Sequence, residues 1–594
     1  MKRYFWIFLF LILFAAFTIS AQTTEKKPVK QCNAQLARQI VEQQVDFSKT
    51  LGETSQRVNV LIRVADFLWT SDQESARRYF AEAFQIAQDR FREKGFEKKE
   101  SKGMYMPQPD YRFDVIKAVA KRDSEWAKKL SETVLKEFDE DKEKDKRDNF
   151  NKDREVSELL RVATESAKDN PALALTLVRR VMRYPLTNSW YFTLYRMAEN
   201  NQALADQVYG EALVNYADAE VFRFLYLSAY PFARERIFGV ESSSLGSNVP
   251  ANLSPNPNFQ RQFILAFIRR VSKLTPESTD KSLQTSTPES AVAVIAMNEI
   301  ETVVLQQFPD LMPAFSQSKI HANSVVTNEI MEAANKRNES GKNFAKSFAE
   351  KLKELEKSDA DGKLTDFQIV QLITSAKKEE DFKAAERWLD KITEESPRES
   401  AKNYFYFQRS KLASKENRFD DVEKYAEKIG KVELRAVVYF DIAEAKQKNS
   451  TTKLESLESL STIYKMAQKS PDTIEKAQVL LGLAFMYEKV DHFNALDAVS
   501  AAIKTANKLE NPNLFTSFMS QQIVGKDYAS YIGYEVPGFD LNKTFYEISQ
   551  KDFQAAISQA ESFTDKYLRT LAVLASVKDC EKNEVPVKPK VKAK

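Results

Sequence analysis

Apolar residues recur every three or four positions through most of this 594-residue chain, a spacing that favours amphipathic helices over strands. From Val58 to Leu68 they share one face, and Asp72 then stands where it would cap a second helix. Two helices joined by a short turn form a helical hairpin. The same unit returns around Asp123, Asn170 and Asn201. The predicted apolar faces of the first pair contain Val58, Leu61, Ile62, Ala65, Leu68, Trp69, Ala76, Tyr79, Phe80, Ala83 and Ala87.

A longer repeat follows in the carboxy-terminal half, where four segments each begin with a phenylalanine. Phe382 and Phe419 are 37 residues apart, and Phe493 follows after 74 residues, twice that spacing. The fourth segment begins at Phe553. Repeats of this length predict an all-α fold, an α-solenoid of antiparallel helix pairs. The stripe that follows the four phenylalanines consists of Ala385, Leu389, Ile392, Val422, Ala426, Ile429, Leu496, Ser500, Ile503, Ala556, Ala560 and Phe563.

A second signal lies inside these repeats. Its residues are Leu481, Gly482, Phe485, Ala495, Val499 and Ala502. Their spacing resembles the Leu-Gly-x-x-Tyr, Ala and Phe positions of the tetratricopeptide-like superfamily, and the resemblance covers residues 366–577. No Trp precedes the Leu, the Ala is shifted by about one position, and the repeat lengths vary. The resemblance implies a binding scaffold that presents a concave surface to peptides or proteins, and it names no ligand.

Glycine and histidine are scarce, with 13 and 2 residues respectively. Phosphate loops and dinucleotide folds depend on Gly, and most zinc and general-base chemistry depends on His. The chain contains no G-x-x-x-x-G-K-[ST] and no G-x-S-x-G, and neither His321 nor His492 lies in H-E-x-x-H. We therefore assign no catalytic, cofactor-binding or metal-binding residue and expect a protein that is not an enzyme.

One stretch, Asp359 to Leu364, resembles the middle of an EF-hand calcium loop. Position 1 of such a loop would be Lys357 and position 12 would be Gln368, so two acidic ligands are missing. Calcium takes about 6–8 oxygen ligands, which this loop does not supply. The alternative is a helix–helix turn, in which Gly362 ends one helix and Thr365 forms a capping box with Gln368. We favour the turn.

The amino terminus has the pattern of a secretory signal peptide. A basic start at Lys2 and Arg3 is followed by an apolar run over residues 4–17 and then by small residues. We expect a signal peptide over residues 1–21, with cleavage after Ala21; the alternative is an uncleaved anchor. The exported protein would be periplasmic or extracellular, with no membrane span after cleavage. Because 88 Lys and Arg balance 85 Asp and Glu, no nucleic acid partner is expected.

The chain has two cysteines, Cys32 and Cys580, close to its two ends. Export permits a disulfide. A bridge needs Cα atoms roughly 5.5–6 Å apart, and an extended array would separate its ends. The sequence therefore leaves the pairing open, with a bond favoured only if the array curves closed.

Two places interrupt the helical pattern. A Ser, Gly and Pro-rich stretch over residues 239–258 reads as an irregular loop. Near residues 525–540, Gly525, Gly533 and Gly538 surround several tyrosines, which predicts a short hairpin or an ordered aromatic loop. The predicted division of the chain is signal peptide 1–21, amino-terminal helical repeats 32–238, linker 239–258, middle helical segment 259–357, carboxy-terminal repeats 364–580 and disordered basic tail 581–594.

Three functions compete. The first is an exported, non-enzymatic helical-repeat scaffold that mediates protein or peptide interactions in the bacterial envelope. The second is an envelope glycan-binding repeat protein resembling SusD-type receptors, which combine tetratricopeptide-like helices with long loops. The third is an α/α-toroid polysaccharide enzyme. We favour the scaffold, because catalytic motifs are missing while amphipathic helix pairs repeat.

Overall fold

The computed structural model describes residues 32–94, 98–101, 104–107, 110–141, 149–168, 170–234, 237–238, 249–276, 288–332, 334, 346–526 and 528–580. The predicted signal peptide, the basic tail and residues 239–248 of the predicted linker lie outside them. The chain forms two compact units. Unit 1 comprises residues 1–51, 406–522 and 531–594, and unit 2 comprises residues 52–405 and 523–530.

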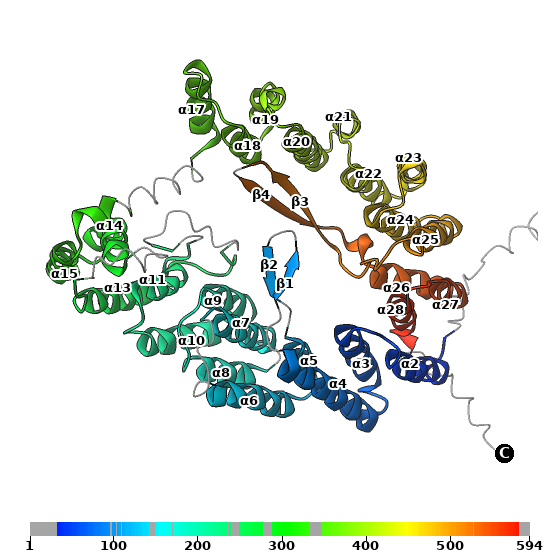
Figure 1. Cartoon of the computed structure of the whole chain (residues 1–594), viewed down its shortest axis with the longest axis horizontal. Coiled ribbons are helices and arrows are strands. Elements are labelled where there is room, and N and C mark those ends of the chain that lie inside the picture. The colour runs from blue at the N-terminus through cyan, green and yellow to red at the C-terminus, as the bar shows by residue number, and fades with distance from the viewer. Residues whose placement is uncertain are drawn as a thin grey trace, which may run out of the picture. The chain divides into compact units, whose positions relative to one another are not determined.

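Unit 2 is built mainly of consecutive helix pairs (Figure 1). Its α-helices are α3 (Thr54–Leu68), α4 (Gln73–Lys94), α5 (Tyr111–Ala120), α6 (Ser124–Asp141), α7 (Asn149–Ser166), α8 (Pro171–Val181), α9 (Ser189–Asn200), α10 (Gln202–Asn215), α11 (Val221–Phe224), α12 (Ala229–Phe232), α13 (Pro257–Val271), α14 (Glu289–Gln307), α15 (Met312–Val325), α17 (Phe348–Ala360), α18 (Asp366–Ser375) and α19 (Glu379–Glu386). Short 3-10 helices are η1 (Leu225–Ser228), η3 (Pro309–Leu311) and η4 (Leu389–Lys391).

Unit 1 continues the pattern and takes in the first described helix of the chain. Helix α20 (Glu395–Lys415) runs across the boundary between the units. The α-helices of unit 1 are α2 (Ala34–Ser48), α21 (Phe419–Ala426), α22 (Val432–Gln447), α23 (Ser456–Lys469), α24 (Ile474–Tyr487), α25 (His492–Ala506), α26 (Leu541–Lys551), α27 (Phe553–Glu561) and α28 (Lys566–Val577). Its 3-10 helices are η5 (Lys453–Glu455) and η6 (Pro537–Phe539).

The predicted turns of the amino-terminal pairs are confirmed. The Asp72 carboxylate accepts a hydrogen bond from the Ser75 amide at 3.0 Å, at the start of α4. Asp123, Asn170 and Asn201 cap α6, α8 and α10 in the same way. Each cap satisfies an amide that has no partner within its own helix. The described chain is therefore mostly helical, with the helix pairs that the apolar spacing predicts.

The predicted apolar stripe is buried in the segments that begin at Phe382, Phe419 and Phe553. In the segment that begins at Phe493 the prediction was wrong, because a different face of the helix is buried. Phe493 has 81% of its surface exposed. Helix α25 starts at His492 behind an Asp491 cap, which leaves Phe493 on the outward side of the first turn. Its buried face instead includes Ala495, Val499 and Ala502, residues of the tetratricopeptide-like match.

A cap that we did not predict recurs in these repeats. A basic residue in the first turn of a helix donates to the backbone carbonyl six positions earlier, in the turn that precedes the helix. This satisfies a carbonyl that would otherwise lack a partner. The four donor–acceptor pairs are Arg398 Nη1 to Ile392 O at 3.2 Å, Arg435 Nε to Ile429 O at 2.9 Å, Lys476 Nζ to Ser470 O at 2.9 Å, and Arg569 Nε to Phe563 O at 3.0 Å.

Two small antiparallel hairpins interrupt the described helices. Strand β1 (Lys98–Ser101) pairs with β2 (Met104–Pro107), with Lys98 opposite Pro107. This hairpin was not predicted, because its strands lack apolar alternation. Strand β3 (Phe518–Val524) pairs with β4 (Ala529–Glu535), so the hairpin predicted near residues 525–540 is confirmed and begins earlier than expected. No described helix is long and apolar enough to cross a membrane.

Candidate functional site

The β3–β4 hairpin is the main departure from helix pairs in unit 1. Its base, which we define as β4 and the η6 segment that follows it, packs on α22 and α24. The Phe539 ring lies 6.3 Å from that of Phe440 in α22. A Cβ atom on Gly538 would lie 3.1 Å from the Cα atom of Gly482 in α24. A Cβ on Gly482 would in turn lie 2.8 Å from the Phe440 ring and 2.9 Å from the Phe539 ring. Glycine at both positions therefore allows the hairpin base to approach the helix closely.

Tyr534 on β4 is packed rather than exposed. Its ring centroid lies 5.2 Å from that of Phe407 in α20. Burial raises the pKa of the Tyr534 hydroxyl, and the nearby carboxylates of Glu433 and Glu475 raise it further. Burial also raises the pKa of the Glu433 carboxyl. Aromatic rings and the partly desolvated carboxyl of Glu433 thus lie close together beside Tyr534.

The other face of β3 is open. Gln521 is buried, whereas Phe518, Ser520 and Gln522 on the opposite face are exposed. Phe518 keeps 59% of its surface accessible, although its ring covers the backbone of Gly533. Because side chains alternate between the faces of a strand, an exposed Phe among polar neighbours gives this face an apolar contact point.

The turn of the hairpin belongs to unit 2 and is tied to that unit. The Tyr528 ring lies 5.5 Å from the ring of Phe367, and the Lys526 amide donates to Glu394 at 3.3 Å. Burial raises the pKa of the Tyr528 hydroxyl to about 12, with further contributions from Asp366 and Glu394. Both described tyrosines of the aromatic loop, Tyr528 and Tyr534, therefore pack against helices. The side chain of Tyr531 lies outside the described residues.

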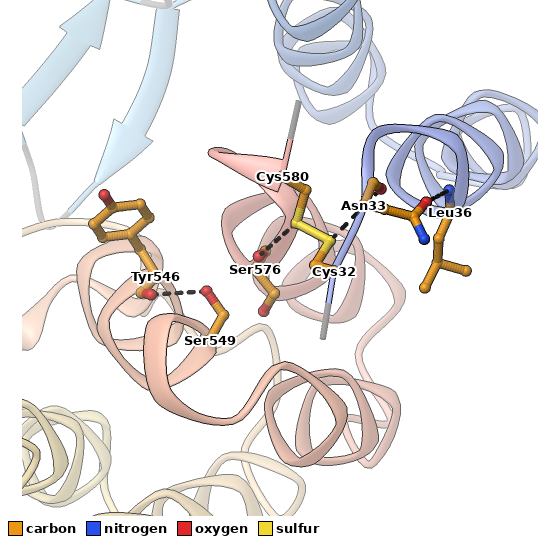
Figure 2. Close-up of a disulfide and its surroundings, with 7 residues drawn as sticks. All are labelled: Cys32, Asn33, Leu36, Tyr546, Ser549, Ser576 and Cys580. Carbon is orange, nitrogen blue, oxygen red and sulfur yellow. Dashed lines mark hydrogen bonds between the residues drawn. A yellow bond between two sulfur atoms is a disulfide. The ribbon is translucent and has the colours of Figure 1, made fainter. Parts of the chain in front are cut away.

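The two cysteines form a disulfide in unit 1 (Figure 2). Cys32 and Cys580 have Cα atoms 5.4 Å apart and a sequence separation of 548 residues, and each is 5% exposed. Cys32 directly precedes α2, whose first turn is capped by Asn33 through the Leu36 amide at 2.9 Å. Cys580 follows α28. The pairing that the sequence left open is thus present, and such a bond is typical of an oxidising compartment.

Helix α2 also packs against α28 through side chains other than the two cysteines. Its buried residues share one face, and the Arg569 guanidinium of α28 lies 5.7 Å from the centre of the Phe47 ring. The contact joins the first and last described helices of the chain. The buried face of α2 consists of Ala37, Val41, Val45 and Ser48.

The calcium-like stretch is a helix–helix turn, as predicted. Gly362 has a φ of 67°, the left-handed conformation that suits the end of a helix. Thr365 and Gln368 form the predicted capping box at the start of α18. The Asp359 carboxylate pairs with Lys391 Nζ at 2.5 Å. Within the described residues, no group of three or more His, Cys, Asp or Glu side chains is arranged to hold a metal ion.

Each histidine is engaged locally. In unit 2, His321 Nε2 lies 2.9 Å from the Leu274 carbonyl oxygen. In unit 1, His492 Nδ1 lies 2.9 Å from the Glu488 carboxylate, which also pairs with Lys551 Nζ at 3.0 Å. The two histidines thus contact a backbone carbonyl and a carboxylate, and these contacts join neighbouring elements.

A cluster of aromatic side chains that sequence reasoning missed lies on α9, α11 and η1 of unit 2. The rings of Tyr191 and Phe192 are 4.1 Å apart, and those of Phe222 and Tyr226 are 5.2 Å apart. Phe192 and Phe222 are 38% and 40% exposed. The four-residue spacing of Phe222 and Tyr226 is a signal that could have marked this surface.

Comparison with known proteins assigns no family. No family model matches the chain, and no curated protein matches it. A solved circular tandem repeat protein with novel repeat topology and enhanced subunit contact surfaces is similar at 13% identity, over 92% of this chain and 97% of that chain. Its TM-score is 0.13, so this match carries no argument about fold or function.

Proposed function

We propose that this protein is an exported, non-enzymatic helical-repeat scaffold that binds a protein or peptide partner in the bacterial envelope. The observation that carries the proposal is the open face of β3, where Phe518 is 59% exposed beside Ser520 and Gln522. The segment that follows β4 packs closely on α24, since Gly482 and Gly538 lie against each other, and this packing supports the hairpin. Exposed features on a rigid support are typical of binding surfaces.

Two features support the compartment. The amino-terminal residues have the pattern of a signal peptide, and the Cys32–Cys580 bond suits an oxidising environment. A periplasmic or extracellular location satisfies both.

Site-directed photo-crosslinking tests the scaffold. A benzophenone amino acid placed at Ser520 samples the open face of β3, and the same group at Val214 on α10 is the control, because Val214 is 79% exposed and lies in unit 2. The proposal predicts a discrete protein adduct at Ser520 that is absent at Val214. Identical adducts at both positions, or none in the native envelope, would contradict it.

The aromatic cluster on α9, α11 and η1 favours a second candidate, a glycan-binding repeat protein. Exposed aromatic rings stack against the apolar faces of sugars, and Phe192 and Phe222 offer such rings. Replacing both by Ser should abolish retention on an envelope-glycan column and leave the Ser520 adduct intact. Unchanged retention, or no retention of the unmodified protein, removes this candidate.

A further inference from the structure

The junction of α2 with α28 brings together helices from opposite ends of the chain. Helix α2 has 15 residues, a length at which an isolated helix is marginal in water. Its apolar face is covered in the structure, and it packs against α28. Helix α2 therefore depends on packing against α28, the last described helix of the chain.

The partner helix is almost entirely buried. Of the residues of α28, those from Thr570 to Val577 are all buried, as are Tyr567 and Leu568. Helix α26 and helix α27 also pack against α28. Loss of α2 would uncover part of this apolar surface, so the last helix pair of unit 1 is complete only when α2 is in place.

The disulfide adds a covalent restraint to this docking. The two cysteines are separated by 548 residues, and the entropic cost of closing a loop grows with its length. A disulfide lowers the conformational entropy of the unfolded chain, so less entropy is lost when α2 docks on α28. Because both cysteines are 5% exposed, the bond is shielded from reagents once α2 has docked.

We propose that α2 and the Cys32–Cys580 bond form a late-closing clasp. Helix α2 completes unit 1 only after α28 has been synthesised and both cysteines have reached an oxidising compartment. There, one cysteine thiolate attacks the disulfide of an oxidant and forms a mixed disulfide. The second thiolate displaces the oxidant, which leaves as a dithiol carrying the two electrons. Before export the two ends stay unlinked, and the chain remains free to be translocated.

Hydrogen exchange on the chain 22–594 tests the clasp in a single molecule. The amides of α2 are compared between the oxidised protein and the C32S/C580S variant, with α3 in unit 2 as the internal control. The clasp predicts that α2 exchanges at least about 30-fold faster in the variant, which corresponds to the lower end of a typical disulfide contribution. Exchange in α3 should stay unchanged. Equal protection of α2 in both proteins would overturn the proposal.

Trapping of free thiols tests the order of events and does not depend on the partner of the scaffold. Alkylation after a pulse of synthesis should find both thiols free in leader-deleted chain kept in the reducing cytoplasm. The exported chain should acquire the bond. Formation of the bond in the cytoplasmic chain at the same rate would contradict late closure.

Discussion

Arg112 in unit 2 and Arg435 in unit 1 both lie in the first turn of a helix, and their guanidinium groups have different partners. Arg112 is fully buried; its Nη2 pairs with Asp110 at 2.6 Å and its Nη1 with Glu137 at 2.8 Å. Its guanidinium also lies 3.5 Å from the centre of the Phe91 ring. Arg435 instead donates from Nε to the Ile429 carbonyl at 2.9 Å.

The partners of the two guanidinium groups illustrate two ways in which an arginine stabilises a helix pair. Around Arg112 the charges are buried and interdependent, so removal of the cation leaves the buried Asp110 carboxylate uncompensated. At Arg435 the acceptors are neutral backbone carbonyls, that of Ile429 and, at 3.2 Å from Nη2, that of Glu427, so removal of the donor costs hydrogen bonds but leaves no buried charge. Two helical glycines also differ in their surroundings. A Cβ atom on Gly210 of α10 would meet nothing within 4 Å, whereas one on Gly482 of α24 would meet two aromatic rings.

The largest effect is expected for Arg112→Met. It leaves Asp110 and Glu137 without their buried cation, and should destabilise unit 2 by about 3–5 kcal/mol. Urea unfolding followed by exchange in α5 measures it. Arg92→Met is the matched control, because Arg92 pairs with the same Glu137 from the surface at 2.8 Å and should change little. Equal effects from both variants would show that burial of Arg112 does not set its ion pairs apart from the surface pair of Arg92.

Gly482→Ala and Gly210→Ala should act in opposite directions. At Gly482 the new methyl group forces the rings of Phe440 and Phe539 apart, which should cost about 1–3 kcal/mol. At Gly210 the space is open, and an alanine in a helix should stabilise by about 0.5–1 kcal/mol. Thermal unfolding of the two variants side by side measures both. Stabilisation by Gly482→Ala would show that the hairpin base is not closely packed.

Arg435→Met should cost about 1–2 kcal/mol, because the Ile429 carbonyl loses its donor. Arg435→Lys should recover much of this, since Lys476 makes the equivalent contact to Ser470 at 2.9 Å. Denaturant midpoints of the pair are the measurement. A loss as large as that of Arg112→Met would mean that the recurring cap stabilises the helix by more than its hydrogen bonds to neutral carbonyls.

The smallest effect concerns pH. Burial raises the pKa of Glu433, so folding favours its protonated form. Stability then falls as the pH rises from the ordinary Glu value, near 4.5, through the raised value. Glu433→Gln should be more stable than the parent at pH 7, by less than about 1 kcal/mol. The two proteins should converge below pH 4. A constant difference at all pH values would exclude titration as the cause.

Much of the helical architecture could be predicted because its signals are local. Asp72 and Asn201 stand at the turns where they cap helices, and Gly362 and Thr365 mark the turn before α18. The glycines around Gly533 likewise indicated the hairpin. Such features depend on residues within a few positions of each other, which a sequence displays directly.

The remaining features depend on contacts between distant segments. Nothing local indicates that α2 packs against α28, or that Cys32 lies beside Cys580. The predicted buried face of α25 was wrong because we took the large Phe493 as its first residue, whereas the face that packs against the core of unit 1 consists largely of small alanines. The open face of β3 was also missed, since exposure of Phe518 depends on which face the helices cover.

The intact mass of the protein purified from its native envelope fraction tests the central claim, an exported chain joined at its two ends. We predict the mass of residues 22–594 less two hydrogen atoms, with no cysteine available to a thiol reagent until the protein is unfolded and reduced. A mass that includes Met1 to Ala21, together with two reactive thiols, would contradict both the export and the clasp.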